Sequence, residues 1–197
     1  MHEGRGEGGG RVHRWCAGVT EDLEPVIAVL SGHLPHLFAV VDPAREPGVL
    51  EWLNDVRLPF QCLFQGEKAV SLAEEAPYLV QFGQDGGALR KLVQAHHGGA
   101  AVTYLVSDAP FYVVRRHLRR IQMVKTDDDE TLFFRYYDPR IARVFLPTCD
   151  EEQIRWMFGE VVQRWVTEGA DGARLVEHYV TADDGGATRR VGFDRVA

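Results

Sequence analysis

Apolar residues recur along the chain in short runs, and the spacing within the runs changes from strand-like to helix-like and back. Continuous apolar or aromatic runs predict buried strands at residues 37–41 and 101–106, and further strands at residues 60–64 and 78–82. Between them, apolar positions three or four residues apart predict helices at residues 23–30, 49–54, 67–76, 88–96 and 111–124. Strands that alternate with helices through residue 146 predict an α/β fold, with a mostly parallel or mixed sheet flanked by helices.

One stretch, residues 131–149, combines a predicted strand, a turn and a short helix. Residues 132–137 are apolar and aromatic except for Arg135, which favours a strand covered on both faces. Asp138 is a good helix N-cap and Pro139 suits the first helical position, so a helix is predicted to begin there. Binding sites in open α/β sheets form at the carboxyl ends of strands, which draws attention to the charged residues of this turn.

The chain divides by composition into three parts. Residues 1–12 are rich in glycine and polar residues, which predicts a disordered arm. Residues 13–146 carry the alternating strands and helices of the main α/β domain. After Pro147, a capping-box sequence from Thr148 to Glu151 and two short apolar runs predict a small C-terminal helix-plus-hairpin lobe, residues 147–197.

Charge and cysteine usage limit the class of protein. The 22 basic and 29 acidic residues give a net charge of −7, which argues mildly against a general affinity for nucleic acid or anionic membranes. The three cysteines are far apart and form no CxxC pair, which is typical of free thiols in a reducing compartment. No apolar run approaches the roughly 20 residues that span a bilayer. These features predict a cytoplasmic protein.

The strongest local charge is the run Arg115-Arg116-His117-Leu118-Arg119-Arg120, which falls on a predicted helix. One interpretation is a docking face for an anion or an acidic protein. The other is a solvated helix face that the acidic run at residues 127–130 neutralises. A nucleic-acid module is a further hypothesis, although aromatic residues are not interleaved on the exposed side as they are in many single-strand binders.

Two Asp-Pro pairs, at Asp42 and Asp138, each follow a predicted strand. The two carboxylates could therefore lie at neighbouring strand ends and serve a metal-dependent hydrolase, or each could simply cap a helix. The histidines have no Cys or carboxylate at a ligand-like spacing, no serine lies in a GxSxG elbow, and no glycine-rich phosphate loop follows a strand. The sequence therefore predicts no metal, no cofactor and no catalytic nucleophile.

Four segments carry a resemblance to a known family: LFAVVDPAR (37–45), APYLVQF (76–82), RRHLRRIQMVK (115–125) and FFRYYDPRIARVFLPTCDEEQIRWMFGEV (133–161). They resemble the effector-chaperone, or adaptor, family of bacterial type VI secretion systems, over residues 34–161. The resemblance implies a non-catalytic cytoplasmic adaptor that binds a cognate toxin (the effector) and helps load it onto the VgrG spike. Together with the charge pattern, it predicts partner binding at Arg115, Arg116, Arg119, Arg120, Arg135, Tyr137, Asp138 and Arg140.

Overall fold

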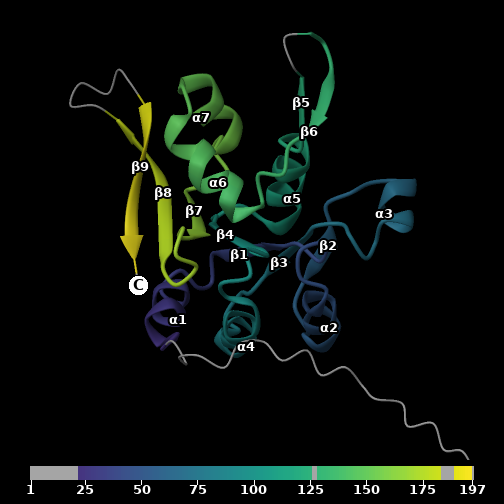
Figure 1. Ribbon diagram of the computed structural model, residues 1–197, viewed down its shortest axis with the longest axis vertical. Coiled ribbons are helices and arrows are strands. Elements are labelled where there is room, and N and C mark those ends of the chain that lie inside the picture. The colour runs from purple at the N-terminus through teal and green to yellow at the C-terminus, as the bar shows by residue number, and fades with distance from the viewer. Residues whose placement is uncertain (1–21, 126–127, 183–188, 197) are drawn as a thin grey trace, which may run out of the picture.

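A sheet between two layers of helices forms the fold (Figure 1). The computed structural model describes residues 22–125, 128–182 and 189–196. Within them the main sheet has seven strands, in the order β2 (Phe60–Cys62), β3 (Tyr78–Gln81), β1 (Leu37–Val41), β4 (Val102–Val106), β7 (Arg164–Glu168), β8 (Leu175–Ala182) and β9 (Arg189–Val196). The helices are α1 (Glu24–Ser31), α2 (Gly48–Asp55), α3 (Glu67–Ser71), α4 (Gly86–His96), α5 (Phe111–Arg120), α6 (Pro139–Phe145), the 3-10 turn η1 (Leu146–Thr148) and α7 (Glu151–Met157).

The central strand β1 shows why the fold has three layers. All five of its residues are fully buried, because both faces of the sheet are covered. Leu37, Ala39 and Val41 belong to the core under α1, α2 and α4. Phe38 and Val40 face the opposite way, into the core under α5, α6 and α7. In Figure 1 the first helix group lies below the sheet and the second above it.

The sheet is antiparallel, so the prediction of a mostly parallel or mixed sheet is wrong. Every neighbouring pair of strands in the main sheet is antiparallel. Strands β3 and β4 run in the same direction and are joined across α4, as the alternating pattern predicts, but β1 lies between them in the opposite direction. A continuous apolar run indicates only that both faces of the strand are covered. Helices can cover both faces of an antiparallel sheet as well as those of a parallel one.

The C-terminal helix and hairpin, predicted as a small lobe, belong to the same sheet and core as the rest of the fold. The hairpin does form, from β7 and β8, but β7 pairs with β4 through Tyr104 and Val166 and so continues the main sheet. Helix α7 packs over the same sheet, with Ile154 and Met157 buried in the second core. The capping box of α7 consists of Asp150 and Gln153, two residues later than predicted.

Residues 131–137 do not form the predicted buried strand. Thr131–Phe133 is strand β6, an exposed strand that pairs with β5 (Met123–Lys125) in a separate hairpin projecting from the second helix layer (Figure 1). The buried aromatic residues of the stretch, Tyr136 and Tyr137, lie in the turn that follows. Helix α5 accordingly ends at Arg120, earlier than predicted.

Several predictions fall on residues that are not described or only partly so. The predicted arm, residues 1–12, and Cys16 lie outside the described residues. Cys62 and Cys149 are free thiols, as predicted. No helix in the described part of the chain has both the length and the apolar character needed to cross a membrane.

Candidate partner-binding site

Helix geometry divides the four arginines of α5 into two pairs. Residues four apart share a face of a helix, so Arg115 and Arg119 form one pair and Arg116 and Arg120 the other. The first pair faces β2 and α3, where Arg115 Nε and Nη2 donate to the Cys62 carbonyl oxygen at 3.1 and 2.8 Å. The second pair is exposed and faces α7. The predicted basic face is therefore two surfaces.

Arg116 and Arg120 line a groove of about 720 Å³ between α5 and the end of α7, which we call the basic groove. A third arginine, Arg155 of α7, lies on its other wall. The full lining is Val113, Arg116, His117, Arg120, Arg155, Gly159, Glu160 and Val161. Among the described residues, the ion pairs include none of these three arginines, and one acidic side chain, Glu160, lies in the same lining.

His117 forms the floor of the basic groove and braces its walls. Its Nε2–H donates to the Met157 carbonyl oxygen at 2.9 Å, which ties α5 to α7. Its Nδ1 accepts from Arg120 Nη2 at 3.3 Å, so the ring is neutral. Burial lowers the pKa of His117, and the nearby Arg120 charge lowers it further, although the Met157 carbonyl opposes the shift. The ring therefore stays neutral near pH 7 and adds no charge of its own.

The carboxylate of Asp42 is fully buried at the end of β1 and pairs with Arg135. Arg135 Nη2 donates to Asp42 Oδ2 at 2.5 Å, and the guanidinium also lies 5.7 Å from the centre of the Tyr137 ring. Burial raises the pKa of Asp42, and the Arg135 hydrogen bond and charge only partly oppose the shift. This pair attaches the turn after β6 to the end of the central strand.

Asp138 is the N-cap of α6, as the sequence predicts. Its side chain accepts from the Arg140 backbone N–H at 3.0 Å and from the Arg140 guanidinium at 2.9 and 2.5 Å. Burial raises the pKa of Asp138, but the hydrogen bonds from Arg140 outweigh it, so the pKa is lowered overall. The carboxylate is almost fully buried, whereas the Arg140 side chain is half exposed.

The Asp138 charge contributes to the raised pKa of Asp42, so the two carboxylates lie within electrostatic range of each other. Each forms an ion pair with its own arginine. The described residues contain no cluster of three or more His, Cys, Asp or Glu side chains that could hold one. Asp138 caps α6, as the capping interpretation predicts, but Asp42 caps no helix, because α2 begins after Pro47 without a side-chain cap. Asp42 instead pairs with Arg135.

Tyr137 is also integrated into the fold. Its carbonyl oxygen accepts from Thr103 Oγ1 of β4 at 2.7 Å, and its ring is 2% exposed. Burial raises the pKa of its hydroxyl to about 12. Arg135, Tyr137, Asp138 and Arg140 thus hold the turn before α6 against the sheet, and a further role in partner binding stays a prediction.

Sequence reasoning missed two features of this surface. Arg155 lies near Arg116 and Arg120 only because α7 packs beside α5. No local sequence pattern indicates that contact. The β5–β6 hairpin exposes Met123, Leu132 and Phe133. Met123 fell in the predicted helix 111–124, and Leu132 and Phe133 fell in the predicted buried strand. Their exposure of 48%, 52% and 42% marks the hairpin as a second candidate interaction surface.

Comparison with protein families gives one match. Residues 37–155 match the model of a domain of unknown function, DUF4123, which covers more than half of the chain and includes β1 to α7 almost completely. No curated protein and no solved structure matches the chain. The matched segment holds the whole of α5, both aspartate–arginine pairs and the β5–β6 hairpin. The chain therefore belongs to the DUF4123 family.

Proposed function

We propose that this protein is a non-catalytic adaptor of a type VI secretion system. It binds a cognate toxin in the cytoplasm and helps load it onto the VgrG spike. The resemblance of residues 34–161 to effector chaperones supports this function, and the DUF4123 match covers nearly the same residues. Both Asp-Pro turns are held by arginines, which fits a scaffold better than a hydrolytic centre.

The basic groove carries this proposal. Arginines are common anchors of protein interfaces because a planar guanidinium can form paired hydrogen bonds with carboxylates. Three of them, without acidic partners among the described residues, surround one concave surface. Complementary charge accelerates association and favours the correct partner, so an acidic surface of the toxin is the expected occupant.

The test is co-purification of the chain with the toxin encoded beside it. Charge reversal at the groove, Arg116→Glu with Arg120→Glu, is expected to reduce recovery of the toxin at least tenfold. Both side chains are exposed, and the only side-chain hydrogen bond lost among the described residues is the 3.3 Å contact of Arg120 with His117, so the unfolding temperature should stay close to that of the wild type.

The matched control reverses two exposed basic side chains on the opposite helix layer, Arg57→Glu with Lys91→Glu. It changes the net charge by the same amount and should leave recovery of the toxin unchanged. If both variants lost recovery of the toxin equally, the effect would be due to net charge and not to the basic groove. Full recovery with the groove variant would show that the basic groove is not the dock.

A further inference from the structure

A second groove lies on the other side of α5, between α3 and the β5–β6 hairpin. It has a volume of about 390 Å³, and we call it the Arg119 groove. Its lining residues are Leu63, Phe64, Gln65, Lys68, Leu72, Arg119, Gln122, Met123 and Phe133. The lining is mostly apolar, it includes two basic side chains, and it includes no acidic one.

Two hydrogen-bond donors in this lining have no partner among the described residues. They are Arg119 Nε and Gln122 Nε2, and both atoms are buried. The Gln122 side chain belongs to a residue that is only 4% exposed, so its amide is not freely solvated. A buried donor without an acceptor destabilises the fold, because it has lost its hydrogen bonds to water without replacement. An acceptor brought by a ligand would remove that cost.

Within the described part of the chain, the charge of Arg119 has no acidic partner. No carboxylate of the described residues pairs with it, and Arg115 lies one turn away on the same face of the helix. Burial and the Arg115 charge lower the pKa of Arg119. A guanidinium in this position is stabilised by an anion that also accepts hydrogen bonds, and a carboxylate meets both needs.

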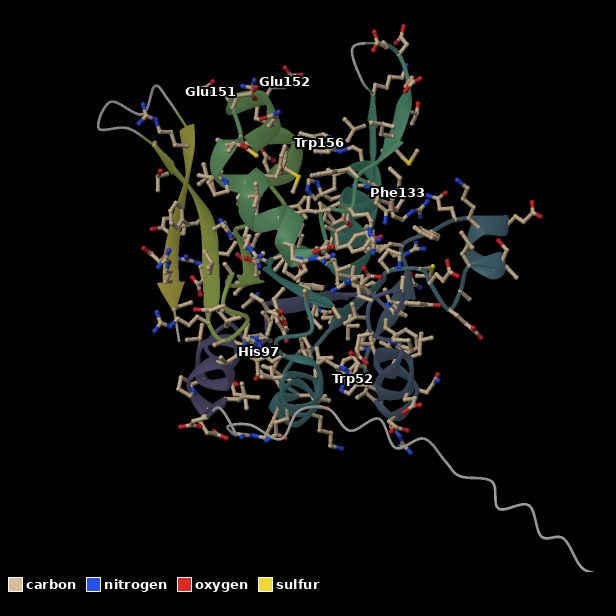
Figure 2. The ribbon with its side chains drawn as sticks, viewed as in Figure 1. Trp52, His97, Phe133, Glu151, Glu152 and Trp156 are labelled. Atoms are coloured by element: carbon tan, nitrogen blue, oxygen red, sulfur yellow. The ribbon has the colours of Figure 1, made fainter. Side chains whose placement is uncertain are left out.

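The apolar part of the groove continues beyond the donors. Phe133 and Met123 pair across the hairpin, so their side chains share the face towards α3. Phe133 also contacts Phe64 edge to face, with ring centres 5.4 Å apart. Leu72 at 37% and Val70 at 80% exposure extend the apolar surface onto and past α3. Figure 2 shows Phe133 on this side of the hairpin base and Trp156 on the opposite side.

We propose that the Arg119 groove binds a segment of a partner polypeptide that presents a carboxylate beside a large apolar side chain. The carboxylate accepts from Arg119 and Gln122, and the apolar side chain packs on Met123, Phe133 and Leu72. The apolar surface is wider than a single small carboxylate would cover, which favours a polypeptide. This inference deepens the proposed adaptor function and rests on it, but it concerns a surface separate from the basic groove.

The test measures binding of a peptide panel to the full chain by fluorescence anisotropy. Each labelled nonapeptide carries one central glutamate flanked by leucine, isoleucine, methionine or phenylalanine, and each has a glutamine twin. At least one glutamate peptide is expected to bind about tenfold more tightly than its twin, the size of one charge-assisted hydrogen bond. In Arg119→Gln this preference should disappear, whereas in Arg116→Gln, on the basic groove, it should remain.

The hairpin offers a matched pair of variants for the apolar half. Met123→Ser should weaken binding of both peptides of a pair by a similar factor. Leu132→Ser should have no effect, because Leu132 pairs with Val124 and faces the other side of the hairpin. Both residues are about half exposed, so neither change should unfold the protein.

Three outcomes would overturn the inference. The first is that no glutamate peptide binds more tightly than its twin. The second is that free 3-phenylpropionate binds as tightly as the best peptide, which would make the groove a small-molecule site. The third is self-association of the wild type that Arg119→Gln abolishes, which would make a second copy the occupant. None of these outcomes affects the Arg116 and Arg120 test, so the two proposals can fail separately.

Discussion

Removing the guanidinium of Arg135 leaves the fully buried carboxylate of Asp42 without its ionic partner. Loss of one partner of a buried ion pair typically costs about 3–5 kcal/mol. The Arg135 side chain is 39% exposed, so solvent screens the pair and a smaller loss is appropriate. We expect Arg135→Met to lower the free energy of unfolding by about 2–3 kcal/mol. For a chain of this size the unfolding temperature should fall by roughly 4–12 °C.

The pH dependence identifies the cause of this loss. Burial raises the pKa of Asp42 in the folded state, so the folded protein binds a proton more readily than the unfolded chain. Stability contributed at this site therefore falls as pH rises from the unfolded pKa through the folded one. Without Arg135 the folded pKa rises further, so the destabilisation of Arg135→Met should be larger at pH 8 than at pH 5.

The assay is urea unfolding followed by tryptophan fluorescence at both pH values. The control is the double variant Asp42→Asn with Arg135→Met, which has no buried charge. Its stability should lack the pH dependence that Asp42 contributes to the wild type, and at pH 8 it should exceed that of Arg135→Met. Equal losses in Arg135→Met at pH 5 and pH 8, or strictly additive effects in the double variant, would refute the reasoning.

Two further predictions concern other buried carboxylates. Asp138→Ala removes the α6 N-cap and both bonds to the Arg140 guanidinium, so it should lower the free energy of unfolding by about 1–2 kcal/mol. Because the folded pKa of Asp138 is lowered, the stability difference from the wild type should shrink as the pH falls through that pKa. A constant difference in an acid titration would contradict this. Glu168 accepts from the Gly98 and Ala100 backbone N–H groups at 3.0 and 2.9 Å. In Glu168→Gln only one oxygen remains to accept, so hydrogen exchange at one of these amides should accelerate, and unchanged exchange at both would count against this role.

Local features of the fold were predictable from the sequence. The buried run of β1 and the Asp138 cap depend on residues that are neighbours in the chain. The split of the α5 arginines into two pairs follows from helix geometry once the helix itself is recognised. The burial of Val114 and Leu118 on the inner face of α5 follows from the same spacing.

Features that depend on distant contacts were not predictable. The antiparallel order of the sheet depends on the insertion of β1 between β3 and β4, and no local pattern specifies strand direction. Tyr136 and Tyr137 are buried in a turn because they contact Phe134, Trp165 and Thr103. An apolar run in the sequence does not distinguish a buried turn from a buried strand. The basic groove needs Arg155 from a helix about 35–40 positions beyond Arg116 and Arg120, and the Arg119 groove needs α3 and the hairpin.

Secretion of a toxin encoded beside this chain tests the proposed adaptor function most directly. The gene for this chain would be deleted, and the toxin would be measured in the medium after complementation with the wild type or with the Arg116→Glu, Arg120→Glu variant. The account predicts that deletion abolishes secretion of that toxin, that the wild type restores it and that the variant does not. Unchanged secretion of the toxin after deletion would contradict it.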